Sequence, residues 1–323
     1  MAMKEYVKKI AIDLGSANLK IAGEVSGKMQ FKKIKSKVSL DAIDDNYTVT
    51  LNNRTLYFGV GDSLVQQDKT NREYIEETIL LAVHEIYGAQ KEPVLIDLAI
   101  GLPLNLYKSE NKKEYFDTKL HSMKANIIAG FVNGDEVFVK LNTIKVFAEG
   151  YSGFMALHEK MDTSAPFMIV DLGYRTTDVL SIDIDDEGEM VISGYKTFDT
   201  GMLEVFNDIQ KAFLNDTGSN TPVSTIENCM VMGHKIKVDR EKVDVHDWFS
   251  EGSRTIKTLF KDVELHFPDF KNRDIYLVGG GSYLVDEIIK FMIEKDGVGF
   301  DTQLVASQDE LIYCNVMGYF IQL

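Results

Sequence analysis

Apolar and polar residues alternate along the first part of the chain, with the period of half-buried strands. Residues 7–14 form one such run, and the runs at 19–25 and 31–35 continue it as a β-meander. The runs at 47–51 and 54–58 flank an Asn-Asn pair, which predicts a hairpin.

A helical period follows these strands. Over residues 72–87 the apolar positions recur every three or four residues, and Gly88 is placed as the stop of the helix. The run at 94–103 is nearly all apolar, so we expect a central strand there. Residues 127–141 carry Asn133-Gly134 between two apolar runs, the strongest short hairpin signal in the chain.

The second half repeats the order of elements found in the first half. Its predicted elements are a helix from about Gly150, strands at 167–171, 177–184 and 190–195, a helix at 201–214 and a strand at 275–279. This repetition indicates a tandem duplication of one mixed α/β unit.

The duplication predicts two packed lobes around a cleft, at residues 1–165 and 166–323. Polar insertions near 28–90 and 215–260 are expected to form smaller subdomains, and a last helix at about 308–323 is expected to pack back on the first lobe. A length of 323 residues suits two domains of ordinary size.

Charge and cysteine content narrow the class of protein. The 35 Lys and Arg residues against 50 Asp and Glu residues give a net charge of −15, so non-specific binding to DNA is not expected. Only Cys229 and Cys314 are present, without zinc-site spacing. The start of the chain lacks the uninterrupted apolar stretch of a signal peptide, and no run approaches the ~18 apolar residues of a membrane span. We therefore expect a soluble, cytoplasmic protein.

An Asp-x-Gly turn follows a buried strand twice, once in each half. IAIDLGSANLK at 10–20 places Asp13 and Gly15 at the end of its strand, and MIVDLGYRTTDV at 168–179 places Asp171 and Gly173 in the same relation. Successive backbone N–H groups at such a bend bind phosphate oxygens, and a carboxylate beside phosphates commonly serves Mg²⁺ through its waters. Aspartate is also an ordinary turn former, but its recurrence at equivalent places favours the metal-positioning interpretation.

Other polar residues near these turns suit a polyphosphate. Lys20 could neutralise a phosphate or simply be solvated, and Ser16, Thr176 and Thr177 offer hydroxyls and amides. A third glycine element, IYLVGGGSYLV at 275–285, has Ser282 as its expected N-cap. Its glycines would let a flat ring approach the backbone, or they form only a strand-to-helix turn. The Rossmann and Walker fingerprints are both missing from this sequence.

These motifs, in this order, resemble those of the actin, heat-shock chaperone and sugar kinase superfamily. The resemblance rests on DLGSANLK at 13–20, AEGYSG at 148–153, DLGYRTTD at 171–178 and LVGGGSYLV at 277–285, so it covers nearly the whole chain. It implies an α/β, actin-like fold, in which two duplicated ribonuclease H-like lobes surround a nucleotide cleft, each with a smaller inserted subdomain.

Within the superfamily the chain is most similar to bacterial actin-like proteins of the ParM type. YFGVGD at 57–62, GLPLNLY at 101–107 and DTG at 199–201 look like that group. Two positions depart from the usual pattern. Ala148 stands where a proline is frequent, and Tyr174-Arg175 replaces smaller residues of the second loop, with Arg175 expected to reach solvent.

The resemblance also implies roles for individual residues. Asp13 and Asp171 would hold Mg²⁺ through water. Glu149 and Asp171 would be catalytic, with Glu149 orienting or deprotonating the attacking water. A carboxylate at position 149 could instead serve as a helix N-terminal acid. The implied nucleotide-binding residues are Asp13, Gly15, Ser16, Asn18, Lys20, Gly173, Thr176, Thr177, Gly201, Gly279, Gly280, Gly281 and Ser282.

The function that the resemblance implies is that of a filament-forming ATPase. ATP, or GTP as an alternative, would bind with Mg²⁺ and drive head-to-tail polymerisation. An adaptor DNA-binding protein on a centromere-like DNA site would then couple the filament to plasmid segregation. Two alternatives stay open at this point: a small-molecule kinase of the same superfamily, and a non-polymerising, nucleotide-gated scaffold. A membrane partner is not expected, and a chaperone is disfavoured because the two lobes use the whole chain.

Overall fold

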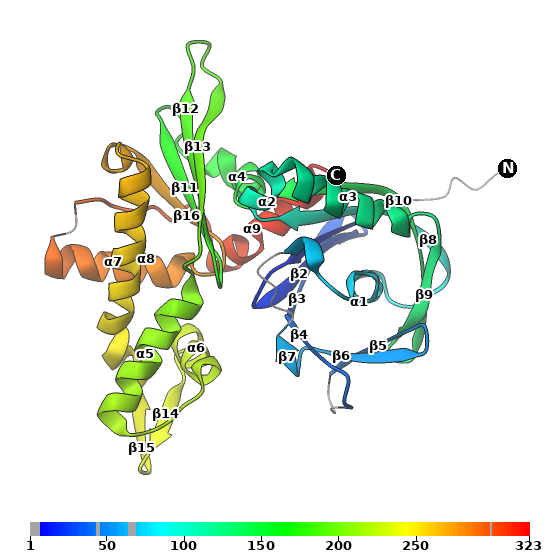
Figure 1. Cartoon of the computed structure of the whole chain (residues 1–323), viewed down its shortest axis with the longest axis horizontal. Helices are drawn as coiled ribbons and strands as arrows, with labels where there is room; N and C mark the ends of the chain where they lie inside the picture. The colour runs from blue at the N-terminus through cyan, green and yellow to red at the C-terminus, as the bar shows by residue number, and fades with distance from the viewer. Residues whose placement is uncertain (1–6, 43–45, 64–68, 298) are drawn as a thin grey trace. The chain divides into compact units, whose positions relative to one another are not determined.

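The computed structural model describes residues 7–42, 46–63, 69–297 and 299–323 and divides the chain into two compact units (Figure 1). Unit 1 comprises Met1–Ala156 with Tyr313–Leu323, and unit 2 comprises Leu157–Ile312. Unit 2 therefore begins earlier than the expected boundary at 165/166, and the end of the chain belongs to unit 1. Within the described residues, no helix combines the length and the apolar character that crossing a bilayer requires.

Unit 1 is built on a ten-stranded sheet with the order β3-β2-β1-β8-β10-β9-β5-β6-β4-β7. Its strands are β1 (Lys8–Leu14), β2 (Asn18–Val25), β3 (Lys28–Lys35), β4 (Lys37–Ser39), β5 (Tyr47–Leu51), β6 (Arg54–Phe58), β7 (Asp62–Ser63), β8 (Gln90–Leu102), β9 (Ile127–Val132) and β10 (Asp135–Ala148). The parallel strands β1, β8 and β10 lie at its centre, as expected for apolar runs that are covered on both faces.

The sheet of unit 1 curls around the helix α1 (Ile75–Tyr87), which Figure 1 shows inside the curve. The buried residues of α1 pack against the strands because its apolar positions cover most of its circumference. The helix ends at Gly88, whose φ of 72° is in the left-handed region that glycine adopts without strain. The predicted helix at 72–87 is thus confirmed from Ile75 onward.

The opposite face of this sheet is covered by α9 (Gln308–Ile321). Small residues of three adjacent strands, Ala11, Ala22 and Ala99, pack against Val316 and Tyr319 of the helix. The remaining helices that begin in the first half are η1 (Lys69–Asn71), α2 (Leu104–Lys108), α3 (Glu110–Met123) and α4 (Tyr151–Leu157), the last followed by η2 (His158–Lys160). The last helix thus buries its apolar side in the unit that contains the first strand.

Unit 2 contains a four-stranded sheet with the order β13-β12-β11-β16. The strands are β11 (Phe167–Leu172), β12 (Thr177–Ile184), β13 (Met190–Phe198) and β16 (Asp274–Val278). The other elements are α5 (Met202–Thr217), α6 (Val223–Met232), η3 (Val245–Trp248), α7 (Phe249–His266), η4 (Phe270–Asn272), α8 (Ser282–Asp296) and the hairpin β14 (Lys235–Val238) with β15 (Glu241–Asp244). A second hydrophobic core lies between the helices and this sheet.

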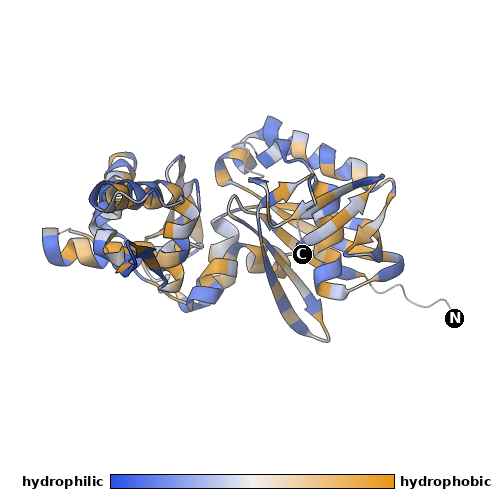
Figure 2. Cartoon of the chain, turned by 90° about the horizontal axis from the view of Figure 1, so that it is seen from below, coloured by the Kyte–Doolittle hydropathy of each residue, from blue (hydrophilic) through white to orange (hydrophobic). Residues whose placement is uncertain are grey.

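Most sequence-predicted elements are confirmed. Asn52 and Asn53, with φ of 51° and 62°, form the turn of the first hairpin, and Asn133-Gly134 forms that of the second. The expected N-cap at Ser282 is wrong, because Gly281 occupies the cap position and Ser282 begins the helix. Figure 2 shows hydrophobic residues on the inner strands and inward helix faces, which is the pattern from which these elements were predicted.

Candidate functional site

The first Asp-x-Gly turn joins β1 to β2 in unit 1. A Cβ at Gly15 would lie only 2.4 Å from the carbonyl oxygen of Asn18, so the tightness of this turn requires glycine. Ser36 Oγ donates a hydrogen bond to Gly15 O at 2.6 Å, and Arg72 Nη2 donates to Ser36 Oγ at 2.6 Å. The half-buried Ser16 and Asn18 lie in the same turn. A buried arginine thus supports the turn through a serine.

A buried cluster of charges surrounds the carboxylate of Asp13. Lys20 Nζ donates to Asp13 Oδ2 at 2.9 Å. Lys69 Nζ lies 4.0 Å from Asp13 Oδ1 and donates to Glu149 Oε1 at 2.5 Å. The structure therefore brings together three predicted site residues, and it adds Lys69 and Arg72, which the sequence reasoning missed.

The electrostatics of this cluster favour an anion. Burial would raise the pKa of Asp13, but Lys20, Lys69 and Arg72 outweigh it and hold the pKa below its ordinary value of 3.8. Burial lowers the pKa of Arg72 to about 10, against the opposing effect of the Asp13 and Glu149 charges. Among the described members of the cluster, the three cations Lys20, Lys69 and Arg72 face the two carboxylates of Asp13 and Glu149. Such a site is suited to receive negatively charged phosphate.

Glu149 directly follows β10 and is fixed by the backbone on both sides. Its N–H donates to Leu102 O at 2.8 Å, and the next residue, Gly150, has a φ of 72°. The Gly150 N–H donates to Asn315 Oδ1 at 2.9 Å. The Glu149 side chain pairs with Lys69, so the structure places this carboxylate in the charge cluster, directly before the residue that precedes α4.

The second Asp-x-Gly turn joins β11 to β12 in unit 2 and closes on itself. The Gly173 N–H donates to Thr176 O at 3.0 Å, and Thr177 Oγ1 donates to Thr200 O at 2.8 Å. The N–H groups of Met202 and Leu203, in the first turn of α5, donate to the carbonyls of Gly173 and Tyr174. The loop is therefore attached to the start of α5.

Three glycine segments meet around this second turn. A Cβ at Gly201 would lie 2.7 Å from Arg175 C, and one at Gly281 would lie 2.5 Å from Met202 Cγ. A Cβ at Gly279, whose φ is +87°, would lie 2.2 Å from Asp171 Oδ1. By contrast, a Cβ at Gly280 would meet nothing within 4 Å. The structure thus brings Gly201 and the glycine triplet together with the buried Asp171, whereas the hydroxyl of Ser282 donates to Gly279 O.

The two residues that depart from the usual second loop are both partly buried. Burial raises the pKa of Tyr174 to about 12, and the nearby Glu227 charge adds to the shift. The expectation that Arg175 reaches solvent is wrong at its Nε, which is buried and has no hydrogen-bond partner among the described residues. This loop therefore contains an arginine whose buried Nε–H group has no acceptor among the described residues.

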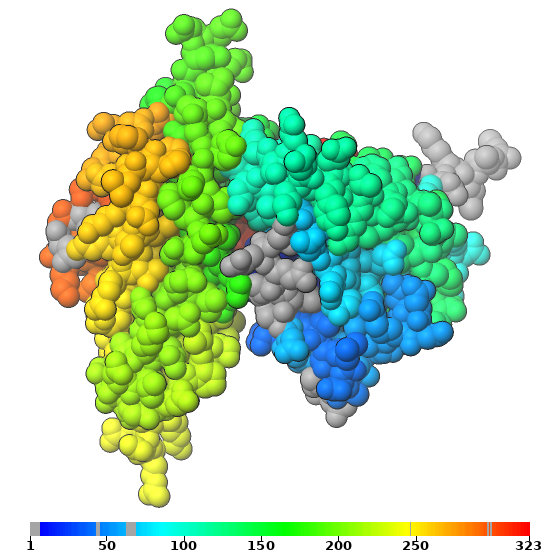
Figure 3. Space-filling model, viewed as in Figure 1, coloured from blue at the N-terminus to red at the C-terminus, as the bar shows by residue number. Residues whose placement is uncertain are grey.

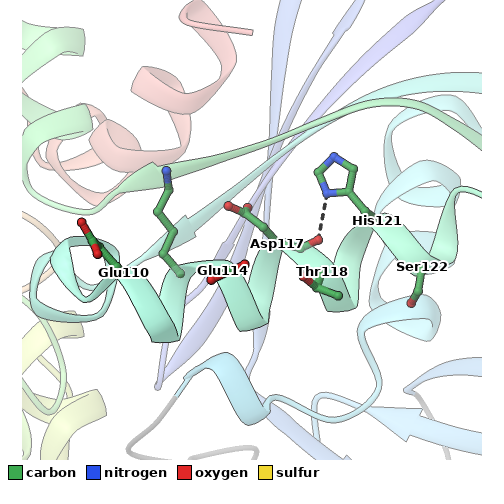
Figure 4. Close-up of a pocket in the computed structure, with 7 residues that line it drawn as sticks. Glu110, Glu114, Asp117, Thr118, His121 and Ser122 are labelled. Carbon is green, nitrogen blue, oxygen red and sulfur yellow. Dashed lines mark hydrogen bonds between the residues drawn. The ribbon is translucent and has the colours of Figure 1, made fainter.

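A shallow pocket lies elsewhere, along α3 (Figure 4). Its lining residues all belong to that one helix: Glu110, Lys113, Glu114, Asp117, Thr118, His121 and Ser122. His121 Nδ1 lies 2.8 Å from its own helix's Asp117 O. None of the predicted site residues lines this pocket, and within the described part of the chain no three His, Cys, Asp or Glu side chains are grouped as a metal site.

Two family models of actin-like proteins match the chain, one over each segment that contains an Asp-x-Gly turn. A model of the N-terminal domain of actin-like proteins matches residues 11–151, and a model of the C-terminal domain of archaeal MreB-like actin homologues matches residues 169–290. No protein of curated function matches the sequence.

Solved structures resemble the chain over its whole length. A pCBH ParM non-polymerisable quadruple mutant is 19% identical and has a TM-score of 0.74 over 98% of this chain and 99% of that one. An archaeal actin homologue is 16% identical, with a TM-score of 0.75 over 98% and 99%. A 15-stranded ParM filament from Clostridium botulinum is 20% identical, with a TM-score of 0.70 over 98% of both chains. Related structures contain ADP, in the archaeal homologue, or AMPPNP, in a Bacillus thuringiensis ParM.

The chain is therefore an actin-like protein, and the expected actin-like fold is confirmed. Its similarity to several ParM structures, at 16–20% identity, reflects this shared fold.

Proposed function

We propose that the chain is a nucleotide-dependent actin-like ATPase that polymerises head to tail and segregates plasmid DNA through an adaptor protein. The observation that carries this proposal is the buried cluster of Asp13, Lys20, Lys69, Arg72 and Glu149 beside the first glycine turn. The cluster places three cations next to a tight backbone turn, which suits a polyphosphate.

Each unit has residues suited to nucleotide binding. In unit 1, the amides of the turn at Gly15, Ser16 and Asn18 bind phosphate, and Lys20 offsets its charge. In unit 2, the loop at 173–177 binds phosphate, and Gly201 with Gly279–Ser282 frames the ribose and base, with open space beside Gly280. ATP is the proposed nucleotide, with GTP as the alternative.

Each Asp-x-Gly turn has a carboxylate of the kind that holds Mg²⁺ through its waters. Asp13 and Asp171 are buried carboxylates, one at each Asp-x-Gly turn, and oxygen is the ligand that Mg²⁺ prefers. Lys20 already occupies Asp13 Oδ2, which suits contact through water better than direct ligation. When bound, the metal would neutralise phosphate charge.

Hydrolysis is assigned to Glu149. Phosphoryl transfer depends mainly on positioning and on charge stabilisation, and a carboxylate that orients the attacking water meets the first need. Lys69 Nζ donates to one oxygen of this carboxylate, Glu149 Oε1, at 2.5 Å and so fixes its orientation. Lys69 is thus proposed as the residue that positions Glu149.

Filament formation is supported by the relatives, among which a ParM from Clostridium botulinum forms a filament. We propose the cytoplasm as the location, which fits two buried cysteines that are not joined by a disulfide. The net charge of −15 suits a DNA link made by a basic adaptor and not by the chain itself.

A pair of variants tests the enzymatic part of the proposal. Glu149→Gln should bind a fluorescent ATP analogue as the wild-type chain does but release phosphate about 100-fold more slowly, within the usual range for removing a positioned general base. Lys108→Gln, an exposed lysine of the same unit, is the control and should change neither quantity. Wild-type phosphate release in Glu149→Gln would contradict the assignment. ATP turnover that requires an added sugar or acid, without polymer, would instead favour a small-molecule kinase.

A further inference from the structure

The strand β3 forms one edge of the sheet in unit 1 and is strongly basic. Among the described strands it pairs only with β2, and it stands at the end of the strand order. Residues 28–37 contain five lysines and no acidic residue, in a chain whose net charge is −15. All five lysines are exposed: Lys28, Lys32, Lys33, Lys35 and Lys37. Among the described residues, only Lys32 of these five makes an ion pair, with Glu85 at 3.5 Å.

The hairpin of β12 and β13 in unit 2 has the opposite character. Its turn, 185–189, contains four exposed acidic residues: Asp185, Asp186, Glu187 and Glu189. Asp185 Oδ1 accepts hydrogen bonds from the N–H groups of Glu187 and Glu189, which fixes the turn. Asp183, just before the turn, is already paired with Arg273. The other acidic side chains of the turn make no ion pair within the described residues.

The strand that leaves this turn is also an edge strand, and it is apolar. β13 pairs only with β12, and Met190, Val191, Ile192 and Tyr195 are between 37% and 42% exposed. Figure 3 shows the hairpin tip projecting from the surface of its unit. An exposed, apolar edge strand presents unpaired N–H and C=O groups together with hydrophobic area, which makes it a place for another chain to pair.

We propose that the acidic β12–β13 hairpin of one copy binds the basic β3 edge of a second copy. This inference rests on the proposed self-assembly and names the surfaces that carry it. Lysines on an edge strand disfavour pairing with most other strands, because their charges would be buried without a partner. A strand that is attached to an acidic turn supplies the opposite charges. Two copies of a protein with a net charge of −15 repel each other over most of their surface. The lysines of β3 form a positive patch to which an acidic element of another copy is attracted.

The two surfaces are different, and each copy has both. Such a heterologous contact extends into an open polymer unless its rotation closes a ring. Pairing of two sheet edges adds main-chain hydrogen bonds to the charge attraction, and the apolar side chains of β13 are covered in the process. The contact therefore combines specificity from charge with affinity from burial.

Charge reversal in trans tests the inference. One variant carries Lys28→Glu, Lys33→Glu and Lys35→Glu, and the other carries Asp186→Lys, Glu187→Lys and Glu189→Lys. Asp185 is left in place because it holds the turn. We expect each variant alone to sediment at least about 10-fold less polymer with Mg-ATP than the wild-type chain, and an equimolar mixture to recover most of the loss.

Two controls separate this contact from a general effect of net charge. Lys91→Glu, Lys108→Glu and Lys112→Glu change the net charge of unit 1 equally at exposed positions and should assemble normally. A single chain with all six reversals should also assemble. If that chain assembles but the mixture does not, the two surfaces meet within one chain and the inference is wrong. Unchanged assembly of both triple variants would overturn it as well.

The experiment distinguishes failure of this contact from failure of the proposed filament function. The hairpin variant should bind a fluorescent ATP analogue within about twofold of wild type, because its reversed residues lie in the turn at 185–189. Lys33 and Lys35 of β3 lie opposite Lys20 and Asn18, so the hairpin variant is the one that separates assembly from nucleotide binding. If the wild-type chain forms no polymer, the proposed function fails. The inference is then decided by sedimentation velocity at about 50 mM salt, where the mixture must form a complex that is lost at about 500 mM. Binding of duplex DNA that depends on β3, with normal assembly of the β3 variant, would show a polyanion site instead and refute the contact.

Discussion

Replacement of Lys69 by methionine removes the cation that links two carboxylates of the charge cluster. The ammonium lies 2.5 Å from Glu149 Oε1 and 4.0 Å from Asp13 Oδ1, and its side chain is only 9% exposed. Methionine keeps much of the side-chain volume, so the main change is the loss of charge. Glu149 is then left buried beside a thioether.

The structure sets the size of the effect. Breaking a buried ion pair by removing one partner costs about 3–5 kcal/mol, because the remaining charge is uncompensated. The lower end applies here, since Asp13 keeps Lys20 at 2.9 Å. A loss of about 3 kcal/mol lowers the melting temperature by roughly 6–12 °C in a unit of this size.

Hydrogen exchange, measured by mass spectrometry in increasing urea, can measure this loss of unfolding free energy separately in each unit. Amides of β8 and α1 report on unit 1, and amides of β11 provide the reference in unit 2. The matched control is Lys32→Met, whose lysine is 45% exposed and lies 3.5 Å from Glu85. That change should cost no more than about 1 kcal/mol, as exposed pairs do.

A double-mutant cycle isolates the pair. If Lys69 and Glu149 are coupled as the geometry indicates, Lys69→Met with Glu149→Gln costs about as much as either single change, and the coupling energy is about 2–3 kcal/mol. Additive losses, or a loss in Lys69→Met no larger than in Lys32→Met, would refute the reasoning.

Three further outcomes are expected. Burial raises the pKa of Asp13, but the nearby cations outweigh it and hold the pKa below 3.8. The stabilisation that Asp13 contributes is therefore present above pH 3.8 and is lost as the pH falls through the lower pKa of the folded state. The difference in unfolding free energy between wild type and Asp13→Asn should shrink in acid. Gly279→Ala should lower the stability of unit 2 by at least about 1–2 kcal/mol, since its φ is +87° and the new Cβ would lie 2.2 Å from Asp171 Oδ1, whereas Gly280→Ala should be neutral in the same thermal melt. Burial raises the pKa of the Tyr174 phenol to about 12, so absorbance should show a tyrosine step near that pH. Its unfolded form ionises near 10, so the unfolding free energy falls between these pH values, and Tyr174→Phe should remove that step.

Local pattern was sufficient to predict the elements whose signals are contained in a few residues. Asn52-Asn53 and Asn133-Gly134 adopt the positive φ values that hairpin turns require, and those residue types tolerate them. The strand at 94–103 is nearly all apolar because β8 is paired on both sides. The second loop and the glycine triplet were predicted to serve one site, and they meet around Asp171.

The missed residues depend on contacts between distant parts of the chain. Lys69 reaches Glu149, 80 positions away, and Arg72 supports Gly15 through Ser36. No spacing in the sequence predicts such a contact. A lysine or arginine is also usually solvated, so its residue type alone does not indicate a buried position. The helix α3 was also missed, since only Phe116 and Leu120 of its 14 residues are buried and its apolar period is weak.

The most direct test of the central claim is sedimentation with light scattering of the purified chain, with Mg-ATP, with Mg-GTP and without nucleotide, beside Asp171→Ala. The account predicts polymer that requires nucleotide, phosphate release that accompanies it, and neither in Asp171→Ala. Phosphate release without any polymer would contradict the filament function, and polymer that is equal with and without nucleotide would contradict its control by ATP.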